Sequence, residues 1–310
     1  MANLKELSRR KEGFVSGHRA CAGCGAATAI RQILLTAANK PTVAGIATGC
    51  MEVISTIYPY TAWNINLVHN AFENSAATVS GMEAAYKALK RRGKVKKDIQ
   101  FIAFGGDGGT YDIGLQALSG ATERRHNMLY VCYDNGAYMN TGYQRSSATP
   151  FGANTTTSPA GSVIPGKLQK RKDLTEIIIA HNPAYAAQAT PGFYMDLIKK
   201  VEKALAADGP SFINILAPCV PGWGYSTDQS MKLSKLAVDT KFWPLYEWQD
   251  GVYKINRKPS EFKPLKEFLQ AQARFRHLFK PGNEHIIDEF QADVDKNWET
   301  LLKKEQATAK

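Results

Sequence analysis

The sequence predicts an α/β fold in which helices cover both faces of a mostly parallel sheet. Short apolar strands alternate with helical segments between residues 26 and 217. A glycine cluster, Gly105–Gly109, directly follows one expected strand, and a helix and another apolar strand come after it. A strand–turn–helix–strand succession of this kind implies parallel strands that are joined by right-handed crossovers.

The elements follow in order along the chain. Expected helices span 26–38, 74–92 (stopped by Gly93), 112–124, 173–181 and 191–207. Expected strands span 43–47, 99–104, 127–133 and 211–217. Residues 136–172 are rich in Gly, Ser, Thr, Asn and Pro and show no periodicity, which is typical of a functional or disordered loop.

The composition changes after about residue 230, where Lys, Glu, Trp and Phe become frequent. We therefore expect an α/β domain over residues 1–230 and an extended C-terminal arm over residues 231–310. An amphipathic helix is expected near 284–303. An arm of this composition suits contacts with neighbouring subunits.

Bulk composition excludes some classes of protein. The 310 residues carry a net charge of +11, but the basic residues are dispersed and do not interleave with aromatics in a nucleic-acid-binding motif, so a basic solvated face is favoured. No uncharged apolar run approaches the roughly 18 residues that span a bilayer, and the N-terminus lacks the apolar stretch of a signal peptide. We expect a cytoplasmic protein that binds neither nucleic acid nor membrane.

Polar residues follow two expected strands. Asp107 lies in the glycine cluster after the strand 99–104, and Asn135 follows the next strand. Consecutive parallel strands bring their carboxyl ends together, where open α/β sheets bind ligands. Carboxylate and amide oxygens suit Mg²⁺ shared with a phosphate, and the glycines and the helix near Asp112 suit the phosphate itself. Each glycine alone is explained by a tight turn, and Asp107 alone by a helix cap.

Cysteine placement indicates a second site. Cys21 and Cys24 form a C-x-x-C, Cys50 follows a strand, and Cys219 follows the last core strand. Four thiolates can hold a [4Fe–4S] cluster. A C-x-x-C is also a common half-site for zinc, so structural zinc stays open on the residues alone. Cys132, inside an apolar strand, is explained as a small buried hydrophobe.

Several motifs in order resemble one family. Residues 105–114 (GGDGGTYDIG) and 133–142 (YDNGAYMNTG), together with 17–21, 58–63 and 155–161, are similar to the β subunit of pyruvate:ferredoxin oxidoreductases over about residues 17–224. The resemblance implies a thiamine-diphosphate-binding fold. It implies that the cofactor is bound by Gly106, Asp107, Gly108, Gly109, Asn135, Ala137, Asn140 and Thr141. Asp107, the Asn135 side chain and the Ala137 carbonyl would bind Mg²⁺, Asn140 would lie near the reacting thiazolium carbon, and Cys21, Cys24, Cys50 and Cys219 would hold the cluster.

The resemblance also implies a reaction and partners. The expected reaction is oxidative decarboxylation of a small 2-oxoacid, pyruvate to acetyl-CoA and CO₂, with coenzyme A as co-substrate. Electrons would pass through the cluster to ferredoxin. The glutamate that activates the cofactor would come from another subunit, so α, γ and δ subunits (fused or separate) are expected partners.

Two alternatives remain from the sequence. Enzymes of the pyruvate type commonly have glutamates where this chain has Ala26 and Gly136. Less negative charge there would suit oxalate, which a related branch oxidises without coenzyme A. The other alternative is a thiamine-dependent decarboxylase in which the cysteines bind structural zinc.

Overall fold

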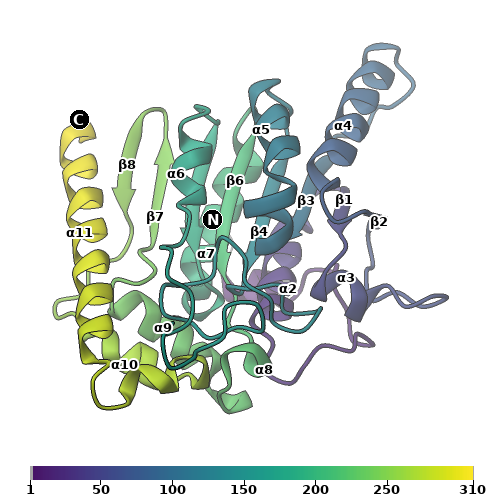
Figure 1. The fold of residues 1–310 in the computed structure, drawn as a ribbon. Coiled ribbons are helices and arrows are strands. Elements are labelled where there is room, and N and C mark those ends of the chain that lie inside the picture. Colours follow the sequence, from purple (N-terminus) through teal and green to yellow (C-terminus); the bar gives the residue numbers. More distant parts are fainter. Residues whose placement is uncertain (1–2, 310) are drawn as a thin grey trace.

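The computed structural model describes residues 3–309, and these contain an eight-stranded sheet in the order β2-β1-β3-β4-β6-β5-β7-β8 (Figure 1). The neighbours from β2 to β5 pair in parallel, whereas β7 pairs antiparallel with β5 and β8 antiparallel with β7. The strands are β1 (Thr42–Ala47), β2 (Asn66–Asn70), β3 (Gln100–Gly106), β4 (Leu129–Asp134), β5 (Tyr185–Ala189), β6 (Ser211–Leu216), β7 (Tyr246–Gln249) and β8 (Val252–Ile255).

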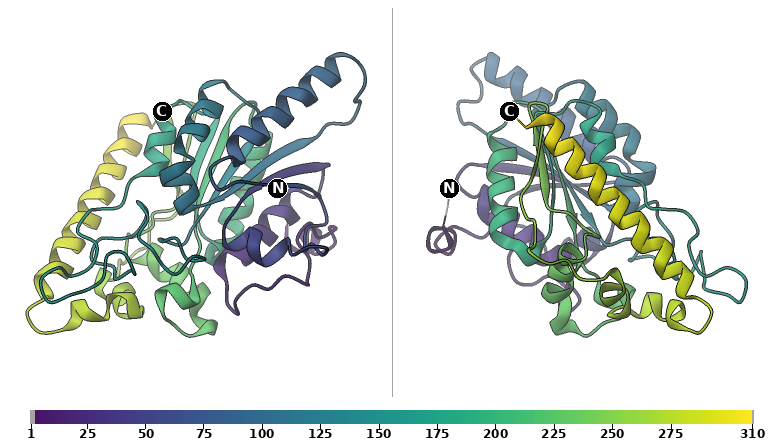
Figure 2. Two further views of the ribbon diagram at one scale, coloured as in Figure 1. Left: turned by 45° about the vertical axis from the view of Figure 1, so that its right-hand side comes forward. Right: turned by 90° about the vertical axis from the view of Figure 1, so that its left-hand side faces the viewer.

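Helices cover both faces of this sheet, as the two turned views in Figure 2 show. The α-helices are α1 (Leu4–Leu7), α2 (Gly25–Ala37), α3 (Cys50–Ser55), α4 (Ser75–Arg91), α5 (Leu115–Glu123), α6 (Leu174–Ile179), α7 (Tyr194–Ala206), α8 (Val220–Trp223), α9 (Ser230–Asp239), α10 (Leu265–Gln270) and α11 (Glu284–Thr308). Helices α2 and α7 pack on one face, and α4, α5 and α6 pack on the other.

Strand β3 shows how the sequence produces these two layers. Successive side chains of a strand point to opposite faces. Ile102 and Phe104 accordingly belong to the core under α2 and α7, whereas Phe101 and Ala103 belong to the core under α4 and α5. All four side chains are buried, which explains why the strand reads as a continuous apolar run. The predicted α/β fold with helices on both faces of a mostly parallel sheet is confirmed.

The C-terminal segment differs from the expected extended arm. Strands β7 and β8 extend the same sheet beyond β5, and α11 runs along them at the edge of the molecule (Figure 1). Trp298 and Leu301 of α11 pack against Tyr246 and Trp248 of β7. The segment after residue 230 therefore builds the chain's own core, because its aromatic side chains are buried there. Its role in contacts with other subunits stays a prediction.

The carboxyl ends of the parallel strands carry the residues that the motifs singled out. Cys50 follows β1, Asp107 follows β3, Asn135 follows β4, and Cys219 follows β6. The loop from Asn135 to Asp173 crosses this end of the sheet (teal in Figure 1) without regular helix or strand. No described helix has the length and apolar character that crossing a membrane requires.

Candidate cofactor and cluster site

The helix after the glycine cluster begins earlier than predicted. A π-helical turn, Gly108–Ile113, starts directly after Asp107 and leads into α5, whereas the sequence suggested a start near Asp112. Gly114 permits this winding, because a Cβ there would lie 2.2 Å from the Gly109 carbonyl oxygen. The π-helical turn therefore lies directly after β3, ahead of α5.

Three oxygen atoms converge beside this turn. The amide oxygen of Asn135 lies 2.9 Å from the Ala137 carbonyl oxygen and 2.9 Å from Asp107 Oδ1. Without a cation this orientation is unfavourable, since turning the amide would allow it to donate to both neighbours. In octahedral Mg²⁺ coordination with ligands at about 2.1 Å, adjacent oxygens lie about 3 Å apart. The donor set and its spacing therefore fit Mg²⁺.

Asp107 is fixed by further hydrogen bonds. The side chain is buried; Ser146 Oγ donates to its Oδ2 at 2.6 Å, and the Asn135 backbone N–H donates to Oδ1 at 3.3 Å. Burial, reinforced by the neighbouring Asp134 carboxylate, raises the pKa of Asp107 well above its usual value. A divalent cation would offset that unfavourable charge.

A pocket of about 200 Å³ opens in front of these oxygens. Its lining combines the ends of β1, β3 and β4: Thr48, Gly49, Cys50, Phe72, Gly106, Asp107, Gly108, Tyr133, Asn135, Ala137, Tyr138, Met139, Asn140 and Thr141. Gly106 and Gly108 lie close under aromatic rings, since a Cβ on Gly108 would be 2.4 Å from the Tyr138 ring. The backbone can therefore approach a bound diphosphate where a side chain would not fit.

The four cysteines lie near one another, and Cys50 also lines the pocket. Cys21 is exposed, and Cys24, Cys50 and Cys219 are half-buried. Burial and the neighbouring Cys219 and Cys24 raise the pKa of Cys50 to about 12, and burial with Cys24 raises the pKa of Cys219 to about 12. The thiols are thus near enough to disfavour one another's ionisation. Among residues 3–309 no three His, Cys, Asp or Glu side chains are placed to hold a single metal ion.

The loop that carries Cys21 and Cys24 packs tightly on the segment that carries Cys219. The Gly25 N–H donates to the Pro218 carbonyl oxygen at 3.1 Å, and a Cβ on Gly25 would lie 2.7 Å from Pro218. Ser230 Oγ of α9 donates to the Gly23 carbonyl oxygen at 2.5 Å. Glycines at these positions bring residues from distant parts of the chain together.

The pocket and the cysteines share a wall. Cys50 and Met139 both line the pocket. A Cβ on Gly222 would lie 2.1 Å from the Met139 sulfur and 3.2 Å from the Cys219 sulfur. Met139 therefore separates the pocket from Cys219 by one side chain.

Comparisons with known proteins identify the family of the chain. The family model described as "Thiamine pyrophosphate enzyme, C-terminal TPP binding domain" matches residues 47–215. "Pyruvate synthase subunit PorB" of Thermotoga maritima is 54% identical, with 99% of this chain and 97% of the relative covered. "Pyruvate synthase subunit PorB" of Methanocaldococcus jannaschii is also 54% identical, over 90% of this chain and 95% of the relative.

The chain belongs to the β-subunit family of 2-oxoacid:ferredoxin oxidoreductases, and it binds thiamine diphosphate. Another member of this β-subunit family, "Ketoisovalerate oxidoreductase subunit VorB" of Pyrococcus abyssi, is 45% identical over 94% of this chain and 93% of the relative. The solved 2-oxoglutarate:ferredoxin oxidoreductase from Magnetococcus marinus shares the fold, with a TM-score of 0.56, 21% identity, and 72% of this chain and 79% of that chain covered.

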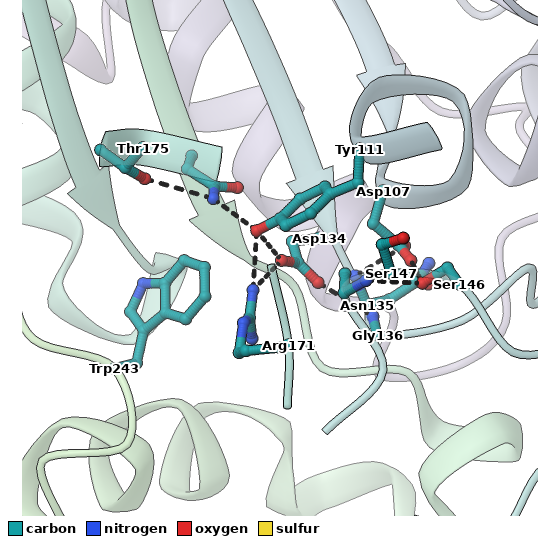
Figure 3. A network of polar contacts seen from close by, with 12 residues as sticks. Asp107, Tyr111, Asp134, Asn135, Gly136, Ser146, Ser147, Arg171, Thr175 and Trp243 are labelled. Atoms are coloured by element: carbon teal, nitrogen blue, oxygen red, sulfur yellow. Dashed lines mark hydrogen bonds and ion pairs between the residues drawn. The ribbon is translucent and has the colours of Figure 1, made fainter. Parts of the chain in front are cut away.

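In this β-subunit family member, a buried polar network supports the loop that carries Asn135 (Figure 3). Arg171 pairs with Asp134, whose other oxygen accepts a hydrogen bond from the Gly136 N–H at 3.0 Å. Tyr111 Oη donates to Asp134 at 2.6 Å and accepts from Asn214 at 2.7 Å. The Arg171 guanidinium also lies 4.8 Å from the Trp243 ring. The network fixes the backbone from which the Asn135 and Ala137 oxygens project.

Replacing Arg171 by methionine is expected to lower the free energy of unfolding by about 3 kcal/mol, because it leaves the Asp134 carboxylate buried without its partner. Urea unfolding measures the loss. The matched control is Arg257→Met, since Arg257 forms an exposed pair with Asp239 at 3.5 Å, and its loss should cost less than about 1 kcal/mol. Equal losses in both variants would contradict this role for Arg171.

The structure locates each residue predicted for the cofactor. Gly106, Asp107, Gly108, Asn135, Ala137, Asn140 and Thr141 line the pocket, with Asn140 and Thr141 exposed at its edge. Gly109 is buried behind it, where a Cβ would lie 2.9 Å from the Phe72 carbonyl oxygen. Ala26 and Gly136 are not among the residues that line this pocket.

Sequence reasoning overlooked other parts of the site. Thr48, Phe72, Tyr133 and Met139 line the pocket, although Tyr133 and Met139 stand inside a motif that was recognised. The Tyr133 hydroxyl is buried without a hydrogen-bond partner in the described chain, and a Cβ on Gly49 would lie 2.9 Å from it. The position of Tyr133 at the end of β4 was the available signal, because strand ends line sites of this kind.

Proposed function

We propose that this chain is the β subunit of a pyruvate:ferredoxin oxidoreductase. In this role it holds Mg²⁺–thiamine diphosphate and one [4Fe–4S] cluster beside it. The observation that carries the proposal is the shared wall of Cys50 and Met139 between the pocket and the remaining cysteines. The names of the pyruvate synthase relatives support pyruvate as the substrate. A cytoplasmic location is part of the proposal.

The chain's own residues perform three tasks in this proposal. Asp107, Asn135 and the Ala137 carbonyl bind Mg²⁺, which anchors the diphosphate. The backbone of Gly106 and Gly108 would face the phosphates, with Gly109 supporting the same turn from behind and Asn140 and Thr141 at the pocket edge. The cluster is held by Cys21, Cys24, Cys50 and Cys219. A [4Fe–4S] core is larger than a single metal ion and each thiolate binds a different iron, so the four sulfur atoms need not converge on one point.

Thiamine diphosphate, held by these residues, would supply the nucleophile and the electron sink that decarboxylation of a 2-oxoacid requires. Asn140 is the catalytic residue proposed to contact the reacting centre. The α, γ and δ subunits would supply the activating carboxylate and complete the pocket, whose open side exposes Asn140. Ferredoxin would take the electrons, and coenzyme A the acetyl group.

Kinetics of the purified complex test the substrate. We expect pyruvate turnover that requires coenzyme A and a low-potential electron acceptor, and no measurable turnover of oxalate. The comparison uses one enzyme preparation, with acceptor reduction followed for each 2-oxoacid. Oxalate oxidation without coenzyme A, together with silence toward pyruvate, would overturn the substrate assignment and leave the cofactor assignments intact.

A further inference from the structure

The C-terminal segment places an arginine in the core without a carboxylate partner among the described residues. Arg274, at the start of the 3₁₀ segment Ala273–Phe279, is only 6% exposed. Its Nε donates to Gln272 Oε1 at 2.9 Å, whereas its Nη2 has no hydrogen-bond partner in the described chain. A buried charge in such surroundings is unfavourable unless an opposite charge lies nearby.

Arg274 lies between the two proposed binding sites. Its guanidinium carbon is 4.2 Å from the centre of the Trp223 ring. The Trp223 backbone N–H donates to the Cys219 carbonyl oxygen at 2.9 Å, and its indole N–H donates to the Asn135 carbonyl oxygen at 2.6 Å. A Cβ on Gly136 would lie 3.0 Å from Arg274 Nη1. One aromatic ring therefore connects the arginine, the Cys219 segment and the magnesium loop.

A close backbone contact holds the arginine in this position. The Ala273 N–H donates to the Gly224 carbonyl oxygen at 3.1 Å. Gly224 has the left-handed φ of 71°, and a Cβ there would lie 2.6 Å from the Ala273 Cβ. The turn after α8 thus requires glycine in order to seat residues 273–274 against the cysteine segment.

Cys219 and Asp134 are the acidic groups that act most strongly on Arg274. Burial lowers the pKa of Arg274 to about 9, and Cys219 is the strongest opposing influence, followed by Asp134. The guanidinium therefore stays charged at neutral pH. No ion pair among the described residues neutralises this charge, and Nη2 is left without a partner.

We propose that Arg274 is the counter-charge of the iron–sulfur cluster and raises its reduction potential. This inference rests on the proposed function, because it requires the cluster. Four thiolates outweigh the positive charge of an oxidised [4Fe–4S] core, and one added electron increases the negative charge without making or breaking a bond. A fixed positive charge nearby favours that reduced state. Arg274 thus acts on the cluster through its charge and does not contact substrate.

Redox titration of the complex, purified without oxygen, tests the proposal. The cluster's electron paramagnetic resonance signal is followed against solution potential for Arg274→Gln, Arg274→Lys and Arg276→Gln. We expect Arg274→Gln to lower the ratio of reduced to oxidised cluster about tenfold at a given solution potential. For a one-electron couple this corresponds to a reduction potential about 59 mV lower. Arg274→Lys keeps the positive charge, so its reduction potential should stay close to that of the wild type. Arg276 is exposed, and its loss should be screened by solvent and change nothing.

Separate outcomes distinguish the two proposals. An intact cluster with unchanged potential in Arg274→Gln would overturn this inference alone, as would a tenfold shift in Arg274→Lys. Absence of any cluster from the wild-type complex would overturn the proposed function instead. If Arg274→Gln fails to assemble, the lysine variant decides, because it keeps the charge and alters the stacking on Trp223.

Discussion

Asp107→Asn is expected to lower the affinity of the complex for thiamine diphosphate in magnesium buffer by roughly 100-fold or more, and to abolish turnover. The variant keeps the shape of the side chain and loses the charge that Mg²⁺ requires. Changing groups that only support a metal ligand typically costs about 10- to 100-fold, so changing the ligand itself should cost at least as much. Isothermal titration calorimetry measures the affinity.

The same variant should stabilise the chain when Mg²⁺ is absent. Because the folded pKa of Asp107 is raised, its carboxylate opposes folding at neutral pH, and this penalty disappears as the pH falls below the unfolded value near 3.8. Asparagine removes the penalty, so the free energy of unfolding should rise by about 1 kcal/mol. Asp98→Asn, at an exposed site, is the control and should alter neither quantity. A loss of both stability and affinity would indicate that Asp107 is merely structural.

Cys50→Ser and Cys219→Ser are each expected to remove the cluster and to eliminate electron transfer to ferredoxin. Serine keeps the size of the side chain, but its alkoxide is a much weaker ligand for iron than a thiolate. Iron and sulfide content, together with the absorption near 400 nm, should fall to background. The large effect follows from the loss of one of only four ligands.

Cys132→Ser is the matched control for these variants. Cys132 is buried in the opposite core, beneath α4 and α5, so its replacement should leave the iron content unchanged. Retention of a full cluster in both Cys50→Ser and Cys219→Ser would refute the assignment of the ligands. Loss of the cluster in the Cys132 variant as well would point to general destabilisation.

The sequence predicted the part of the fold whose signals are local. Strand β3 and its glycine turn are readable because an apolar run stops at Gly105–Gly109. The buried strand β5 was overlooked, since its sequence YAAQA has little of the branched and aromatic character typical of strands. Hairpin β7–β8 was overlooked despite a clear signal: Asp250–Gly251, both with positive φ, forms the two-residue turn.

In the candidate site, too, the residues with local sequence signals were predicted and those with distant partners were not. Asp107, Asn135 and the cysteines follow strand ends, so parallel pairing alone predicts their proximity. Arg171 and Arg274 escaped prediction because their partners lie far away in sequence: Asp134 precedes Arg171 by a long loop, and Trp223 precedes Arg274 by helix α9, hairpin β7–β8 and α10. Only the folded C-terminal segment, expected to form an arm, brings Arg274 to the cysteines.

The most direct test of the central claim is to measure the iron, sulfide, zinc, magnesium and thiamine diphosphate bound to the wild-type complex. The complex is purified without oxygen together with its native partners. We predict that thiamine diphosphate and Mg²⁺ are present with a [4Fe–4S] cluster that Cys50→Ser removes while the cofactor stays bound. A colourless complex that contains zinc in place of iron would contradict the account and favour a thiamine-dependent decarboxylase.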